Sequence, residues 1–224
     1  MSSAKTTQVS LNTDEQRHVA ARSNMYRFMT GILDFPDEEF FNYVNSGDLF
    51  DTVSELTGAL SYKLSVPDDI KTTGYSSYDE FSSDYIKIFD VGVGGPPCPL
   101  YEGFYYLSRQ SIMEELIRFY EYFDLDMNKE QWELPDHISV ELEFMHFLTF
   151  KEAGALSFQK DPSPYRRAQR DFLGRHLLRW LKKLDERLLK INAPGCYRSL
   201  VEFMIKYMEA DYLSLLSATD VTPS

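Results

Sequence analysis

Apolar residues recur every three or four positions through most of this chain, the pattern of helices that each turn one face to a core. Clusters of Gly, Pro and Asn separate the periodic stretches, and no stretch alternates apolar and polar residues between hairpin turns. The pattern predicts helices over 14–33, 38–44, 48–64 and 77–89, from after Tyr106 to near 123, from 135 for roughly 15–20 residues, and over 165–191 and 196–216. Asp48 is expected to cap the third of these.

The predicted fold class is therefore all-α. We expect a single-domain helical bundle of about eight or more helices packed around one core over residues 13–217. The first residues, 1–12, are polar and are expected to form a disordered N-terminal tail, and residues 218–224 a polar C-terminal tail.

The helix expected from Pro135 is the stretch around which the chain is organised. Pro suits the first position of a helix, and Asp136 adds a carboxylate in the first turn, where the helix dipole favours it. His137 and Glu141 fall within the apolar arc, four residues apart, so their side chains can meet. Because an unpaired buried polar group costs on the order of 1–3 kcal/mol, two interpretations stay open: each side chain is satisfied by the other or by a neighbouring backbone group, or the pair forms a recognition surface.

A loop rich in Gly and Pro lies between the fourth predicted helix and the fifth. Residues 91–100 contain three Gly and three Pro, which excludes regular structure there. The segment lacks the spacing of a phosphate-binding loop. A loop of this length inside a compact chain is either a linker or functional.

Charge and cysteine content narrow the function further. The 35 acidic residues outnumber the 23 basic ones, for a net charge of −12, which disfavours a nucleic-acid partner and favours a basic one. No apolar run is long enough for stable insertion in a membrane. Residues 1–8 lack the apolar core of a secretory signal. The chain has only two Cys, too few for a disulfide framework or a cysteine metal site. The expected location is the cytoplasm, with no cofactor and no catalytic residue assigned.

One alternative comes from two Glu-x-x-His motifs, formed by Glu15 with His18 and by Glu143 with His146. This spacing is typical of di-iron carboxylate bundles, so a di-iron helical oxidoreductase is the rival hypothesis. Glu143 and His146 fall on the polar arc of their helix. This position argues against a di-iron site, because metal ligands in such bundles point inward.

Four sets of residues carry a resemblance to a known family. They are Pro135-Asp136-His137-Ile138 with Glu141 to Met145; Tyr85 and Phe89 leading through the loop to Pro99, Glu102-Gly103 and Tyr105; Phe172 with His176 and Trp180; and Cys196-Tyr197. Over roughly residues 78–207 the chain resembles the cytoplasmic redox-enzyme maturation chaperones of the TorD/DmsD/NarJ type, which are all-helical.

The resemblance implies a non-enzymatic protein that binds the twin-arginine leader or N-terminal segment of a molybdenum-cofactor oxidoreductase catalytic subunit. Such a chaperone assists maturation and cofactor insertion before assembly or export. It implies leader-binding or site-shaping roles for Asp136, His137 and Glu141, with Tyr85, Phe89, Pro99, Glu102 and Tyr105 as the facing loop of the leader-binding site. An acidic rim would hold the arginines beside an apolar groove. A monomer and a domain-swapped dimer hinged at 92–99 both stay open, as does the client enzyme.

Overall fold

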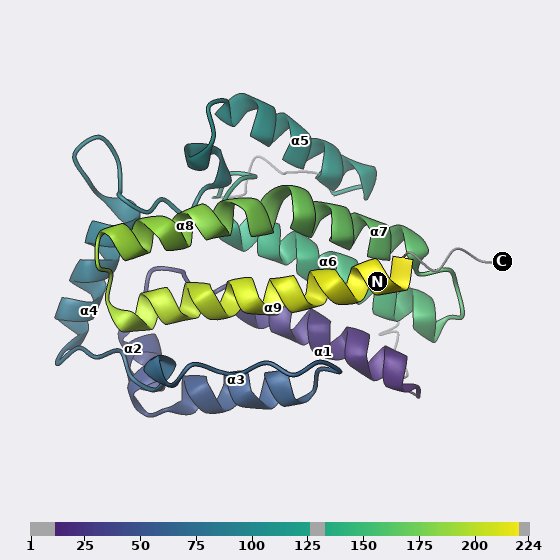
Figure 1. Cartoon of the computed structure of the whole chain (residues 1–224), viewed down its shortest axis with the longest axis horizontal. Helices are drawn as coiled ribbons and strands as arrows, with labels where there is room; N and C mark the ends of the chain where they lie inside the picture. The colour runs from purple at the N-terminus through teal and green to yellow at the C-terminus, as the bar shows by residue number, and fades with distance from the viewer. Residues whose placement is uncertain (1–11, 126–132, 220–224) are drawn as a thin grey trace, which may run out of the picture.

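A computed structural model of the chain describes residues 12–125 and 133–219 (Figure 1). Within these ranges the regular structure is helical and no β-strand forms, so the prediction of an all-helical bundle of about eight or more helices is confirmed. No helix in the described ranges is both long and apolar enough to cross a bilayer. The tails expected at 1–12 and 218–224 lie almost wholly outside the described residues.

The elements follow one another along the chain, with longer connections before η1, before η3 and before α6. They are α1 (Asp14–Met29), α2 (Glu38–Asn45), α3 (Asp48–Gly58), the turn η1 (Asp68–Lys71), α4 (Tyr78–Tyr85), η2 (Ile86–Asp90), η3 (Glu102–Tyr105), α5 (Arg109–Tyr122), α6 (Ile138–Ser157), α7 (Ser163–Phe172), η4 (Leu173–Leu177), α8 (Leu178–Lys190) and α9 (Gly195–Thr219).

Five helices form the centre of the bundle. α1 packs along α6, and α9 packs against both α7 and α8. Figure 1 shows α9 crossing the middle of the molecule, with α5 outside the α7–α8 run on one side and α3 outside α1 on the other. The predicted long helix over 165–191 is confirmed as α7, η4 and α8 in succession, with one π-helical turn at η4.

Both predicted ends of the third helix differ from those of α3, for identifiable reasons. Asp48 is not a cap: Gly47 is the N-cap of α3, with φ of +88°, which glycine adopts readily. The helix ends at Gly58 rather than near 64, because the chain then crosses towards α1 and α9. There the Ser61 amide donates to His18 Nδ1 (3.2 Å) and the Tyr62 hydroxyl to Asp211 (3.2 Å).

The central helix α6 begins at Ile138 rather than at Pro135. The carbonyl of Pro135 accepts the Tyr120 hydroxyl (2.9 Å), and the carbonyl of Asp136 accepts the Glu102 amide (2.8 Å). Both carbonyls are therefore used by neighbouring segments instead of by the first turn. His137 becomes the N-cap, its ring accepting the Ser139 amide.

A buried arginine joins the central helices. The Arg22 side chain of α1 is 3% exposed, and its guanidinium pairs with Asp211 of α9 and donates to Glu152 of α6 (3.0 Å). It also donates to Gln169 of α7, whose amide in turn donates to Glu152 (2.9 Å). Burial alone would lower the pKa of Arg22, but Asp211 and Glu152 raise it well above its ordinary value, so the guanidinium is firmly charged.

We expect Arg22→Met to lower the free energy of unfolding by about 3–5 kcal/mol, because it leaves buried carboxylates without their counter-charge. Arg27→Met is the matched control on the same helix, since Arg27 is exposed; it should change stability by less than about 0.5 kcal/mol. Urea unfolding followed by circular dichroism measures both. Equal stabilities for the two variants would contradict this role of Arg22.

Candidate functional site

The Gly/Pro-rich loop and the start of α6 are joined through their backbones. Tyr101 and His137 form an isolated antiparallel bridge, and the Ile138 amide donates to the Leu100 carbonyl (2.9 Å). Further back in the loop, the Cys98 amide donates to the Ile88 carbonyl of η2 (2.9 Å). These bonds bring the end of α4, the loop and the N-terminus of α6 to one place, which agrees with the facing loop that the resemblance implies.

A hollow of about 490 Å³ opens at this place. We call it the acidic hollow, because four carboxylates and no Lys or Arg are among its lining residues. The carboxylates are Asp34, Asp90, Glu133 and Glu143, all exposed at the rim, and the apolar and aromatic lining is Phe35, Tyr85, Phe89, Leu100 and Tyr101, with Thr30, His137 and Ser139 completing it.

The aromatic side chains of the acidic hollow hold one another in place. The Phe35 ring meets the Tyr85 ring edge to face (5.5 Å between centroids), and Tyr85 packs against Phe89 (5.1 Å). The Tyr85 hydroxyl donates to the Leu33 carbonyl (2.7 Å), while Tyr101 donates to Glu133 (2.9 Å) and its ring lies 4.8 Å from that of His137. The floor is thus a fixed apolar surface under an anionic rim.

The charges of the acidic hollow perturb one another. Burial raises the pKa of Asp34, and the negative Glu133 adds to the rise while His137 opposes it. Burial likewise raises the pKa of Glu143, helped by Asp34. The pKa of His137 is lowered by burial, against the pull of Glu133, Asp34 and Asp136. Its Nδ1 accepts the Ser139 amide (3.3 Å), which places the proton of the neutral ring on Nε2.

Of the residues predicted to bind a leader, three line the acidic hollow. They are His137, Tyr85 and Phe89, which are 8%, 8% and 5% exposed and form part of its inner wall. Asp34, Phe35, Asp90, Tyr101 and Glu133 were missed by the sequence reasoning. Asp34 and Phe35 lie between the first two predicted helices, and no local sequence pattern indicates what an acidic or aromatic residue in a turn will contact.

Two other predicted site residues, Asp136 and Glu102, shape the site from inside. The Asp136 carboxylate is fully buried, accepts Nε and Nη2 of Arg109 (2.9 Å each) and accepts the Gly103 amide (3.2 Å). A Cβ on residue 103 would lie 2.8 Å from that carboxylate, so glycine is required there. Glu102 is also fully buried and bonds His176 Nδ1 (2.8 Å).

The remaining three predicted residues lie beneath the loop. The Tyr105 hydroxyl donates to the carbonyl of the buried Pro99 (2.9 Å). Glu141 is fully buried and accepts Nε1 of Trp180 (3.1 Å), not a proton from His137. His137 and Glu141 therefore do not pair with each other: the imidazole turns back to accept the Ser139 amide, and the carboxylate faces the core.

The Glu-x-x-His residues of the rival hypothesis have other partners. Glu15 pairs with Arg166 (2.6 Å), and His146 Nδ1 lies 2.9 Å from the Ser23 carbonyl, where it donates. In the part of the chain that the structure describes, no group of three or more His, Cys, Asp or Glu side chains is placed to hold a metal ion. The geometry gives the di-iron interpretation no support.

Some proteins take up a segment of another polypeptide in an apolar groove. The sequence profile of the nitrate reductase delta subunit family matches residues 53–186. The chain is 31% identical over 204 residues to the perchlorate reductase assembly chaperone of Dechloromonas aromatica, covering 88% of this chain and 90% of that protein. This chain belongs to the nitrate reductase delta subunit family, which confirms the resemblance to redox-enzyme maturation chaperones.

Two shorter alignments have higher identity. The selenate reductase assembly chaperone of Thauera selenatis is 40% identical over 114 residues, half of this chain, and the chlorate reductase assembly chaperone of Ideonella dechloratans is 40% identical over 112 residues. These matches span 59% and 58% of the two relatives, less than two thirds of their length. All three relatives are named as assembly chaperones and not as enzymes, in agreement with the prediction of a non-enzymatic protein.

We expect the buried Glu141 carboxyl to make the free energy of unfolding depend on pH. Burial and the nearby Glu102 raise its pKa well above the ordinary value, against the hydrogen bond from Trp180. Above the ordinary glutamate pKa of about 4.3 the unfolded chain therefore holds fewer protons than the folded one, so this group costs stability as pH rises.

Glu141→Gln keeps an acceptor for Trp180 without the charge, so it should gain about 1–3 kcal/mol relative to the parent between pH 5 and pH 8. Urea unfolding at several pH values checks this, with the exposed Glu186→Gln as the control that should track the parent. A difference between Glu141→Gln and the parent that stays constant with pH would show that Glu141 is not held neutral.

Proposed function

We propose that this protein is a cytoplasmic chaperone for a molybdenum-cofactor oxidoreductase. It binds the twin-arginine leader or N-terminal segment of the catalytic subunit and assists maturation and cofactor insertion before assembly or export. The acidic hollow is the observation that carries the proposal. The names of the relatives favour a client among the oxyanion reductases, such as those acting on selenate, chlorate or perchlorate.

The rim of the acidic hollow suits a pair of arginines. In the described part of the chain no ion pair occupies Asp34, Asp90, Glu133 or Glu143, so their charge is available to a partner. Each guanidinium can donate two parallel hydrogen bonds to a carboxylate, and such charge-assisted bonds are about twice as strong as neutral ones. A rim of one sign also speeds encounter with a cationic segment.

The inner wall suits the apolar part of a leader. Tyr85, Phe89 and Leu100 lie below the rim, and Phe35 stands 54% exposed beside them, so it can close over a bound side chain. His137 presents a neutral ring on the same wall. A leader that places arginines at the rim and an apolar side chain on the floor uses both halves of the site at once.

Removing charge from the rim should weaken leader binding without unfolding the protein. We expect Asp34→Asn with Asp90→Asn to weaken binding of a synthetic peptide carrying two consecutive arginines before an apolar segment by about fivefold or more. Asp51→Asn with Asp79→Asn removes equal charge from exposed positions outside the hollow and is the matched control. Calorimetry measures both pairs, and a peptide with Gln in place of the arginines tests the ligand side.

If the two double variants bind the peptide equally well, the acidic hollow is not the leader site. The same conclusion follows if the Gln peptide binds as tightly as the Arg peptide.

Leader binding should also weaken on acidification. Because the pKa values of Asp34 and Glu143 are raised, these carboxylates lose charge at a higher pH than ordinary ones, and protonation of His137 adds a like charge to the site. The affinity for the arginine peptide should therefore fall between pH 7 and pH 5. Asp34→Asn with Glu143→Gln should flatten this dependence, whereas an unchanged pH profile in that variant would assign the titration to other groups.

A further inference from the structure

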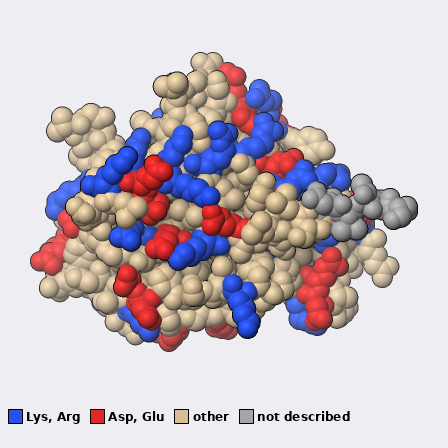
Figure 2. Space-filling model, in the orientation of Figure 1, with Lys and Arg blue, Asp and Glu red and all other residues tan. Residues whose placement is uncertain are grey.

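The positive charge of this acidic chain is concentrated in one segment. Residues 163–190 carry nine Lys and Arg against three Asp and Glu, an excess of six in a chain whose net charge is −12. This segment is α7, η4 and α8. Figure 2 shows Lys and Arg side chains gathered over these helices on the face in view. This uneven distribution gives the side of the molecule that carries α7, η4 and α8 a positive charge, opposite in sign to the charge of the acidic hollow.

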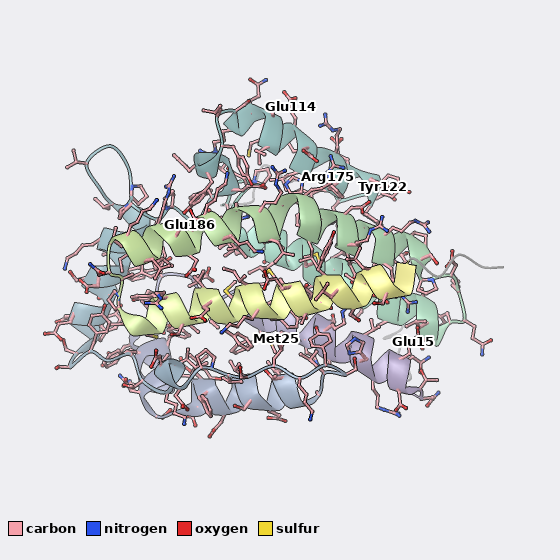
Figure 3. The ribbon with its side chains drawn as sticks, in the orientation of Figure 1. Glu15, Met25, Glu114, Tyr122, Arg175 and Glu186 are labelled. Atoms are coloured by element: carbon pink, nitrogen blue, oxygen red, sulfur yellow. The ribbon has the colours of Figure 1, made fainter. Side chains whose placement is uncertain are left out.

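A groove of about 350 Å³ lies between α5 and this basic segment. Three guanidinium groups line it, those of Arg118, Arg167 and Arg175, together with the aromatic rings of Phe119, Tyr122 and Phe123. We call it the arginine groove. Figure 3 shows Arg175 and Tyr122 near one another, where α5 approaches the α7–α8 run. The arginine groove shares no lining residue with the acidic hollow.

Two of the three guanidinium groups in the arginine groove are available to bind an anion. Arg175 pairs with Glu115 on the groove wall, and Asp171, the other carboxylate of the lining, is met by Arg170 (2.9 Å). Across the residues that the structure describes, Arg118 and Arg167 have no ion-pair partner, and both are exposed. An unneutralised pair of arginines over aromatic rings suits an anion attached to an apolar group.

The aromatic part of the groove is anchored from below but open above. Phe119 meets Phe172 edge to face (5.3 Å), and Phe123 stacks on Tyr165 (5.9 Å). Tyr122, also in the lining, is 76% exposed, and its ring meets that of Phe123 edge to face (5.0 Å). An apolar side chain entering the groove would therefore meet two packed rings and one exposed ring.

We propose that the arginine groove binds an acidic segment of the partner polypeptide, with carboxylates on Arg118 and Arg167 and an apolar side chain against the aromatic rings. The identity of the partner rests on the proposed function, but the class of ligand does not. A short segment fits better than a membrane or a nucleic acid, because an extended polyanion would also face the −12 charge of the whole chain. Two sites of opposite sign would hold one client at two points.

The test uses the full chain and a dye-labelled peptide in which Asp and Glu flank Leu and Phe, followed by fluorescence anisotropy. We expect the parent to bind it and Arg118→Glu with Arg167→Glu to bind about tenfold more weakly or worse. Lys63→Glu with Lys190→Glu makes the same change of charge at exposed positions outside the groove and should bind like the parent. Tyr122→Ala, which changes no charge, should weaken binding severalfold.

The arginine leader peptide is titrated into the same variants, and its affinity should not fall in any of them. If the leader peptide fails to bind the parent while the acidic peptide binds through Arg118 and Arg167, the proposed function is wrong and the proposal for the arginine groove is retained. If the reversed pair does not fold by circular dichroism, Arg118→Gln with Arg167→Gln replaces it.

The proposal is overturned if the parent does not bind the acidic peptide, or if the lysine control loses as much affinity as the arginine pair. It is also overturned if vesicles containing phosphatidylglycerol or a single-stranded oligonucleotide bind through Arg118 and Arg167 while the peptide does not.

Discussion

The buried guanidinium of Arg22 is the constraint on which the rest of the bundle depends. It lies where α1, α6, α7 and α9 approach one another, and it is satisfied only when Asp211, Glu152 and Gln169 converge on it. The hydroxyls of Tyr26 (2.7 Å) and Tyr62 (3.2 Å) complete the shell by donating to Asp211. Apolar packing tolerates small shifts of a helix, but a charged network of this kind does not, because each displaced partner leaves a buried charge unpaired. The cluster therefore fixes how these helices lie relative to one another.

A second polar system fixes the opposite end of α6. Asp136 holds Arg109 and the Gly103 amide, and Glu102 holds His176, so the loop and η3 are tied to both α5 and the π-helical turn η4. Asp136, Glu102 and His176 are buried, yet they position the segment that carries His137 and Tyr101. The motif that first suggested a recognition surface thus acts mainly by building that surface. Its variants are expected to change binding through the fold as well as through contact, so the exposed rim residues are the better probes of function.

The parts of this structure that follow from short-range patterns could be predicted from the sequence. Helical periodicity located the helices, and the Gly/Pro run located the loop, because both signals are local. The partners of Arg22 could not be predicted, because Asp211 is 189 residues away and no local pattern in either segment indicates that the two residues pair. The rim of the acidic hollow could not be predicted for the same reason, because Asp34, Asp90 and Glu133 come from three separate segments of the chain. His137 and Glu141 have the spacing of a pair, but the capping role of His137 takes its ring elsewhere.

If the acidic hollow binds a leader as proposed, its two halves contribute unequally to the affinity. An exposed ion pair contributes about 0.2–1 kcal/mol, so the four rim carboxylates together supply no more than about 4 kcal/mol, and salt reduces that. Micromolar affinity requires about 8 kcal/mol. The balance has to come from the floor, where burying one or two apolar side chains contributes about 1.5–3 kcal/mol each. In the proposed leader complex the rim would select the arginines and the floor would retain the segment. A site built in this way would bind firmly enough to hold the proposed client and weakly enough to release it.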